Sequence, residues 1–300
     1  MPPATRADLD DLAELLASAR EVLVLTGAGM STDSGIPDYR GPDGTRRVTP
    51  VQYQEFVRSA DVRRRYWARA FVGWRRLATA GANAGHHAIA RLQSVGALGA
   101  LITQNVDGLH QAAGSRGVVE LHGALASVVC LACGARSRRA ELDARTRELN
   151  PDFHPDDGEV RPDGDIAFAD AVLAGFVVPR CLGCDSDRLK PDVVLFGESV
   201  PKPRVTRCYA LTDHADVLLV LGSSLRVYSG YRFVRRAAER GIPVAIVTHG
   251  PSRGDPMATV RLDAALGQVL PALAERLHAE PPRAGVPHSL STPARHYGSP

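Results

Sequence analysis

The sequence has no long hydrophobic run and almost no lysine. No stretch approaches the roughly 18 or more apolar residues that span a membrane. Lysine occurs only at positions 190 and 202, so nearly all of the 36 basic side chains are arginine, and the net charge is only +3. So small a charge gives no reason to expect nucleic acid as a partner. We therefore expect neither a membrane nor direct nucleic acid among the partners of this chain.

Cysteine is scarce as well, and the first residues carry no targeting pattern. The opening stretch MPPATRADLDDLAELL is acidic, which argues against both a transit peptide and a secretory signal. Five cysteines in 300 residues do not make a disulfide-stapled secreted domain. We therefore expect a cytoplasmic protein, long enough for one large domain or two modest ones.

Apolar runs typical of buried strands alternate with helical patterns along most of the chain. The runs are EVLVLTG, ALITQ, GVVELHG, ADVLLVLGSS, IPVAIVTHG and ATVRLD. Helical spacing covers residues 6–20, most of 50–93, 228–240 and 264–277. Strands that alternate with helices predict a parallel α/β sheet.

Small or polar residues follow four of these predicted strands, at 27–31, 104–107, 222–224 and 248–250. Ligands of parallel sheets bind at the carboxyl ends of strands, so one shared site is expected there. Gly27 and Gly29 match the start of the dinucleotide fingerprint G-x-G-x-x-G, but Thr32 stands in place of the third glycine. No acidic residue ends a strand about 20 residues later, which disfavours a dehydrogenase.

Four of the cysteines form two C-x-x-C pairs, Cys130 with Cys133 and Cys181 with Cys184. Four thiolates satisfy tetrahedral zinc and leave no open position, so the expected site is structural. The 47 residues between the pairs are more than usual for a zinc ribbon. Redox-active or incidental cysteines are the alternatives. The fifth, Cys208, is interpreted as an inert buried thiol.

Polar residues at two further strand ends are candidates for chemistry. Asn105 and Asp107 can address the polar edge of a ligand, and His122 directly follows the run VVEL. A lone histidine is more often structural than catalytic. Beside the other polar strand ends and a glycine loop, His122 becomes a candidate general base.

Taken together, six motifs in order resemble the sirtuins, NAD-dependent protein-lysine deacylases. They are GAGMSTDSGIPDYRG, TQNVDGLH, ELHG, the two C-x-x-C pairs, KPDVVLFGESVP and LGSSLRVYSG, and the resemblance runs from about residue 8 to 275. The stretches RYWARAFVGW and GSSLRVYSGYRF resemble the class II branch. The resemblance implies a Rossmann-like parallel sheet with helices on both faces, plus a smaller discontinuous zinc-binding and helical domain.

The resemblance also implies how the chain is divided. Residues 1–44, 94–123 and 191–280 would form the NAD-binding domain, 45–93 a helical module and 124–190 a zinc-binding module, with 281–300 a disordered tail. NAD would be a co-substrate, Zn²⁺ a structural ion, and the chain a monomer that acts on acyl-lysine proteins or peptides.

In the implied reaction, NAD is cleaved and its ribose accepts the acyl group of a lysine. Asn105 and Asp107 would hold the nicotinamide, and His122 would take a proton from the ribose. The products would be nicotinamide, 2′-O-acyl-ADP-ribose and free lysine. The remaining cofactor contacts would be Gly27, Ala28, Gly29, Ser31, Ile36, Pro37, Asp38, Tyr39, Arg40, Gln104, Val106, Gly222, Ser223, Ser224, Thr248, His249, Gly250 and Leu266.

The peptide would add as an extended strand along residues 193–199. Its expected contacts are Val194, Phe196, Gly197 and Glu198. Two positions depart from the family pattern: Tyr39 replaces a common phenylalanine, and Thr248 replaces the asparagine expected at the adenosine ribose. Protein ADP-ribosyl transfer by the same site and a non-enzymatic zinc-bearing NAD sensor are the rival functions.

Overall fold

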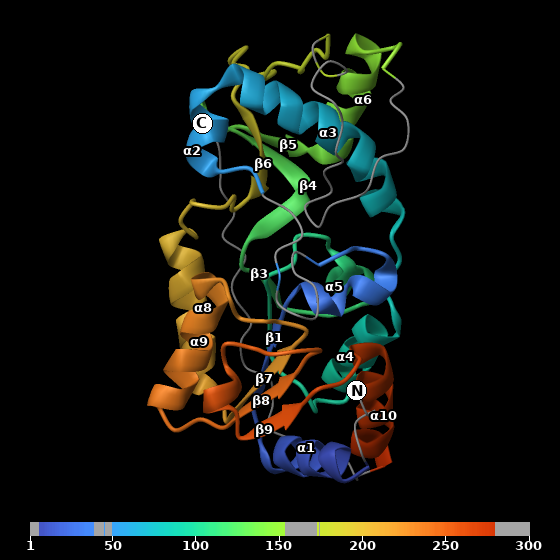
Figure 1. Ribbon diagram of the computed structural model, residues 1–300, viewed down its shortest axis with the longest axis vertical. Coiled ribbons are helices and arrows are strands. Elements are labelled where there is room, and N and C mark those ends of the chain that lie inside the picture. The colour runs from blue at the N-terminus through green and yellow to red at the C-terminus, as the bar shows by residue number, and fades with distance from the viewer. Residues whose placement is uncertain (1–5, 39–44, 46–49, 154–172, 174, 280–300) are drawn as a thin grey trace, which may run out of the picture.

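The computed structural model describes residues 6–38, 45, 50–153, 173 and 175–279 (Figure 1). Six strands form one sheet in the order β3-β2-β1-β7-β8-β9, and every pairing in it is parallel. The strands are β1 Val22–Thr26, β2 Leu101–Thr103, β3 Val118–Glu120, β7 Val217–Leu221, β8 Val244–Val247 and β9 Val260–Leu262. The predicted parallel α/β sheet is confirmed.

Helices cover both faces of this sheet. Strand side chains alternate between two faces, so Val22 and Val24 lie in one apolar cluster and Leu23 and Leu25 in another. The first cluster contains residues of α1 Arg6–Ser18, α4 Ala84–Ser94 and α10 Leu266–Ala279. The second contains residues of α8 Lys202–His214 and α9 Tyr228–Glu239. The middle of the large sheet is therefore buried on both sides, which explains why its central strands β1, β7 and β8 are apolar runs.

A second, antiparallel sheet forms the upper part of the molecule in Figure 1, in the order β5-β4-β6. Its strands are β4 Gly123–Cys130, β5 Arg136–Arg138 and β6 Leu189–Val193. With it lie α2 Tyr53–Arg58, α3 Ala60–Thr79 and α6 Arg139–Leu149. The aromatic residues of α2 and α3 are core: Phe56, Tyr66 and Trp67 are buried, and the Trp67 indole donates to Leu189 O at 2.9 Å.

Two element assignments differ from the expected division. Helix α4, expected in the module 45–93, packs against α10, and its residues Ala88, Ile89 and Leu92 belong to the cluster under the large sheet. Strand β6 pairs with β4 as far as Val193, so the small sheet extends past the expected boundary at 191.

Four helices in the described part of the chain are only three or four residues long. They are α5 Leu109–Ala112 and the 3-10 helices η1 Ala28–Met30, η2 Thr32–Ser34 and η3 Asp255–Met257. Among the described helices, none is both long and apolar enough to cross a membrane. The tail at 281–300 lies outside the described residues.

Candidate active site

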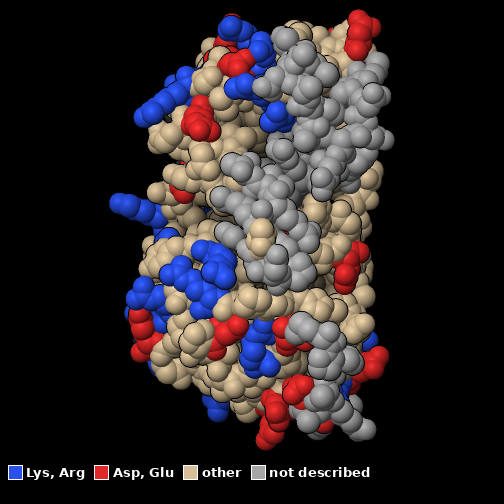
Figure 2. Space-filling view, viewed as in Figure 1, with Lys and Arg blue, Asp and Glu red and all other residues tan. Residues whose placement is uncertain are grey.

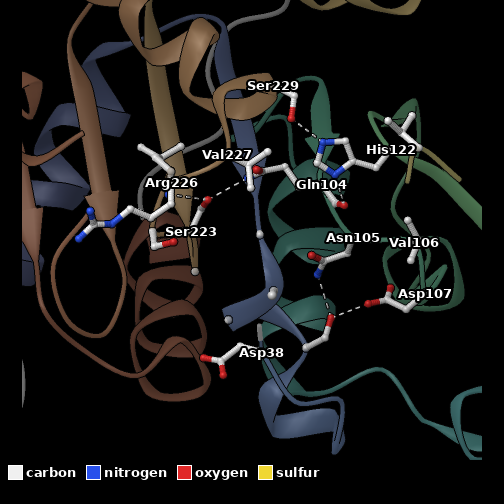
Figure 3. Close-up of a pocket in the computed structure, with 18 of the residues that line it drawn as sticks. Asp38, Gln104, Asn105, Val106, Asp107, His122, Ser223, Arg226, Val227 and Ser229 are labelled. Atoms are coloured by element: carbon white, nitrogen blue, oxygen red, sulfur yellow. Dashed lines mark hydrogen bonds between the residues drawn. The ribbon is translucent and has the colours of Figure 1, made fainter. Parts of the chain in front are cut away.

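A cavity of about 1330 Å³ lies at the carboxyl ends of β1, β2, β7 and β8, and the segment that joins β6 to α8 also lines it. Figure 3 shows some of its lining residues. The cavity brings together nearly all of the predicted cofactor and substrate residues. Those in its lining are Gly27, Ala28, Gly29, Ser31, Ile36, Pro37, Asp38, Gln104, Asn105, Val106, Asp107, His122, Val194, Phe196, Gly197, Glu198, Gly222, Ser223, Ser224, Thr248, His249 and Leu266.

Among the predicted residues that the structure describes, Gly250 is absent from that lining. Tyr39 and Arg40 lie outside the described residues. Gly250 adopts a positive φ of 69° next to the cavity, and its N–H donates to Asp263 Oδ1 at 3.2 Å. Arg261 donates to Thr248 O at 3.2 Å, so this arginine supports the turn that carries Thr248.

Glycine is required where the turn after β1 meets the turn after β7. A Cβ atom on Gly27 would lie 2.7 Å from Ser223 Cβ, and one on Gly222 would lie 2.6 Å from Met30 N. The two turns touch through their backbones, since Gly27 N donates to Leu221 O at 3.0 Å and Gly29 N donates to Gly222 O at 2.9 Å. The chain then passes through η1 and η2 instead of entering a long helix, so no third fingerprint glycine is needed at Thr32.

Asn105 and Asp107 converge on one hydroxyl. Ser31 Oγ donates to Asp107 Oδ2 at 2.8 Å and accepts from Asn105 Nδ2 at 3.0 Å (Figure 3). The other Asp107 oxygen accepts from Leu109 N at 2.9 Å, which fixes the carboxylate. Ile36 is buried beside them. This corner therefore offers a carboxylate, an amide and an apolar wall, a set that can bind a flat carboxamide ring.

His122 sits between two hydrogen-bond partners. Its Nδ1 lies 2.9 Å from the carbonyl oxygen of Gln104, and its Nε2 lies 2.7 Å from Ser229 Oγ (Figure 3). Because a carbonyl only accepts, Nδ1 carries the hydrogen, and Nε2 is the basic atom of the neutral ring. His122 is one of the two residues that join β3 of the large sheet to β4 of the small sheet.

Several groups around His122 act on its charge. The pKa of His122 is lowered from 6.5 to about 4, chiefly by burial and to a smaller extent by Arg204 and Arg232, while the hydrogen bond to Gln104 acts in the opposite direction. The ring is therefore neutral at neutral pH, as a general base must be.

Gln104 connects the turns. Its side-chain amide donates to Ser223 Oγ at 2.9 Å and to Thr26 O at 3.2 Å. A Cβ atom on Gly230 would lie 2.5 Å from Gln104 Oε1, so α9 packs directly on this side chain. Gln104 thus ties β1, β7 and α9 together at the floor of the cavity.

The segment after β6 is held from both sides. Val194 N donates to His122 O at 2.7 Å, and Tyr53 N donates to Phe196 O at 2.8 Å. Glu198 Oε2 accepts from Leu195 N at 2.9 Å, and Gly197 has a φ of 81°. The segment turns at Leu195–Glu198, where Glu198 N donates to Leu195 O at 3.0 Å, and it lies against one wall of the cavity.

The four paired cysteines form one cluster. Their sulfur atoms lie within 4.8 Å of one another, and Cys130–Cys184 and Cys133–Cys181 are each 3.7 Å apart. Sulfurs about 2.3 Å from one tetrahedral zinc ion lie about 3.8 Å from each other, so the cluster fits zinc. Cys208 is fully buried in α8, away from this cluster, as predicted.

Sequence reasoning missed the contribution of α8 and α9 to the cavity. Ser229 and Arg232 of α9 and Lys202 of α8 line it, and so does Arg226 just before α9. The cations therefore lie on this side, and the carboxylates of Asp33, Asp38 and Asp107 on the other. Lysine and arginine also gather on the surface that overlies α8 and α9 (Figure 2). No local pattern in the sequence marks these residues, because their neighbours in the cavity come from distant segments, as with Ser229 and His122.

Comparison with known proteins gives consistent matches. A family model described as the Sir2 family matches residues 27–229. An NAD-dependent protein deacetylase 1 of Streptomyces coelicolor is 52% identical over 278 residues, which cover 92% of each chain. The NAD-dependent protein deacylase Sirt4 of Drosophila melanogaster is 46% identical and covers 90% of this chain and 88% of its own. The NAD-dependent protein lipoamidase sirtuin-4 of Bos taurus is 42% identical, with 92% and 88% covered.

Solved structures agree with the sequence matches. A Sir2 enzyme structure superposes with a TM-score of 0.73 at 32% identity and covers 92% of this chain and 99% of its own. A Sir2 structure with a p53 peptide and NAD⁺ superposes with a TM-score of 0.68 at 27% identity, with 91% and 99% covered. The chain therefore belongs to the Sir2 family, the sirtuins.

Proposed function

We propose that this protein is an NAD-dependent protein-lysine deacylase that transfers the acyl group of a modified lysine to the ribose of NAD. The observation that carries the proposal is the place of His122: its basic Nε2 faces the same cavity as the glycine-lined turns and Asp107. The names of the relatives, which include a deacetylase, a deacylase and a lipoamidase, support the same chemistry.

The cofactor residues divide into two groups. Gly27 and Gly29 bring the two turns together, and Ser223 and Ser224 offer hydroxyl groups to the pyrophosphate. Asn105 and Asp107 would give up the hydrogen bonds that they make to Ser31, and would form hydrogen bonds to the nicotinamide carboxamide instead. Burial of this corner positions the ring and excludes water from the sugar carbon that is attacked.

His122 acts as the general base. It would take a proton from a ribose hydroxyl, so that the sugar oxygen attacks the carbon of the former amide. The neutral state of the buried ring favours this role, and general-base assistance is typically worth roughly 10²–10⁴-fold.

The peptide would bind as a strand beside residues 194–198. Recognition through main-chain hydrogen bonds tolerates many sequences, so we expect loose selectivity. The Sir2 structure that contains a p53 peptide supports a protein substrate. Zinc would be held by the four paired cysteines and would supply only structural rigidity.

The acyl group is the open part of this proposal. Tyr66 is buried and lines the cavity, whereas Arg69, one turn further along α3, is not in the lining. This arrangement supports acyl chains without a carboxylate over succinyl or malonyl. A lipoyl chain belongs in any test, since one relative is a lipoamidase.

The deciding experiment is one panel of acetyl-, lipoyl- and succinyl-lysine peptides incubated with NAD and analysed by mass spectrometry. We expect free lysine, nicotinamide and acyl-ADP-ribose in equal amounts. A protein product heavier by one ADP-ribose, with the acyl group retained, would instead indicate ADP-ribosyl transfer. No nicotinamide release with any peptide would indicate a sensor. The two-domain division, the monomeric state and the cytoplasmic location stay predictions.

A further inference from the structure

The side chain of Ser229 is hydrogen-bonded to Nε2, the basic nitrogen of His122. The distance from Ser229 Oγ to His122 Nε2 is 2.7 Å, and no other described side chain is hydrogen-bonded to that nitrogen. Because the Gln104 carbonyl fixes the hydrogen on Nδ1, the serine hydroxyl must donate to Nε2 (Figure 3). When a ligand enters the cavity, the Ser229 hydroxyl is therefore already hydrogen-bonded to the basic nitrogen of His122.

The position of Ser229 is set by its helix. Ser229 is the second residue of α9, and the next residue, Gly230, packs against the side chain of Gln104. Gln104 is in turn the residue whose carbonyl holds the other side of the His122 ring. The first turn of α9, Gln104 and His122 are thus connected by packing and hydrogen bonds, which place the backbone of Ser229 beside the base.

Ser229 also faces the ligand space, because it lines the cavity and is half-buried. A hydroxyl oxygen that donates one hydrogen bond still has lone pairs with which to accept another. A sugar hydroxyl in the cavity can therefore donate to Ser229 Oγ while Ser229 donates to His122.

We propose that Ser229 is a proton relay between the sugar hydroxyl and His122. In the step, the sugar O–H bond breaks and its proton bonds to Ser229 Oγ, while the Ser229 O–H bond breaks and its proton bonds to Nε2. Serine is unchanged overall, and the sugar oxygen keeps the electron pair with which it attacks the acyl carbon. The inference rests on the proposed deacylase function.

The surrounding charges make a short-lived imidazolium the expected product of the relay. Arg204 and Arg232 both lie close enough to disfavour a positive charge on His122. The same hydrogen bond can return the proton from His122 through Ser229 to the lysine amine as it leaves the acyl carbon. The relay therefore serves both directions of proton movement.

The experiment compares Ser229→Ala, Ser229→Thr and Ser18→Ala with the unchanged enzyme. Ser18 is the matched control, because its hydroxyl only donates to Leu15 O at the exposed end of α1. An acetyl-lysine peptide is the substrate. Exchange of labelled nicotinamide into NAD reports the first step, and single-turnover formation of acetyl-ADP-ribose reports the relay step.

We expect Ser229→Ala to keep nicotinamide exchange within about twofold and to slow acyl transfer by about tenfold or more, with Ser229→Thr close to normal. For the unchanged enzyme, a plot of the acyl-transfer rate against the fraction of D₂O in the solvent should be curved, because two protons move in the same step. Ser229→Ala should give a straight line.

Acyl transfer by Ser229→Ala within threefold of normal, or a straight line for the unchanged enzyme, would overturn the relay. Failure of the unchanged enzyme to exchange nicotinamide would instead contradict the proposed function, so the two failures are distinguishable.

Discussion

The ammonium group of Lys190 in β6 lies 3.0 Å from Oε2 of Glu198, which belongs to the segment proposed to bind the peptide. The lysine side chain is only 4% exposed and the carboxylate 20%. Lys190 Nζ also donates to Val193 O, and the same Glu198 oxygen accepts from Leu195 N. The pair therefore ties β6 to the chain that follows it, and it employs one of only two lysines in the sequence.

We predict that breaking this pair loosens the peptide segment. Glu198→Gln leaves a buried ammonium group without its counter-charge, and such losses cost about 3–5 kcal/mol of folding free energy. Denaturant unfolding measures the loss, and KM for the acyl-peptide should rise more than KM for NAD. The double variant Lys190→Met/Glu198→Gln should lose less than the sum of the single changes. Additive losses would show that the two side chains do not interact.

We predict that His122→Ala separates the two chemical steps. Nicotinamide exchange needs no base at this position and should persist, whereas acyl transfer should fall by roughly 10²–10⁴-fold. Exposed His214 at the end of α8 supplies the control variant His214→Ala, for which both rates should be normal. Wild-type transfer by His122→Ala would remove this histidine as the base.

We predict that the protein loses stability as the pH falls below about 6.5. Burial lowers the pKa of His86 and of His122 to about 4 and that of His110 to about 3. Between these values and 6.5, the unfolded chain binds protons that the folded chain does not, so stability rises with pH in this window. The contribution of these histidines to stability is complete above pH 6.5 and is lost as the pH falls toward 4.

The pH prediction includes one opposing group, since burial raises the pKa of Glu120. Three histidines outweigh it, so denaturant unfolding between pH 7 and pH 4.5 should show net uptake of about two protons on unfolding. A free energy of unfolding that stays constant over this range would contradict the buried neutral state of the histidines.

We predict one zinc ion per chain, removable only with loss of the small sheet. Metal analysis should give one zinc for the unchanged protein and for Cys208→Ala, and close to none for Cys181→Ser. Chelation should lower the melting temperature, because the metal links the turn after β4 with the turn before β6. A chelated protein with an unchanged melting temperature would show that the cysteines do not hold a structural ion.

We predict that Gly27→Ala weakens NAD binding by tenfold or more. The added methyl would meet Gly222 O at 2.8 Å, so the two glycine turns must separate. Gly81→Ala is the control, since a Cβ atom there has no neighbour within 4 Å. Calorimetric titration with NAD distinguishes the two. Equal affinities for both variants would mean that the contact between the turns does not shape the cofactor site.

The strands and their polar ends could be predicted from the sequence because the large sheet is buried on both faces. Its central strands β1, β7 and β8 are apolar runs, and the cavity-lining residues follow directly after them, as at Gly27 and Gly222. The cysteine cluster was predictable for a different reason, since metal-ligand spacing is local in each pair. The roles of the individual cofactor residues stay predictions.

Other features depend on contacts between distant segments and leave no local pattern. Helix α4 follows α3 along the chain, but it docks on α10, where a Cβ atom on Gly85 would approach Leu270 to 3.2 Å. Ser229 lies near the start of a helix, where serine is commonly a cap, and only the fold reveals His122 beside it. The low pKa of His122 likewise arises from burial that no sequence motif reports.

The two sheets of this protein share a junction at Leu121 and His122, since β3 ends at Glu120 and β4 begins at Gly123. Val194, directly after β6, donates its N–H to the carbonyl of His122 itself. The imidazole is thus carried by the short segment that joins the two sheets. The position of the base therefore depends on both sheets at once, and a substitution in either sheet that shifts this segment also shifts the ring.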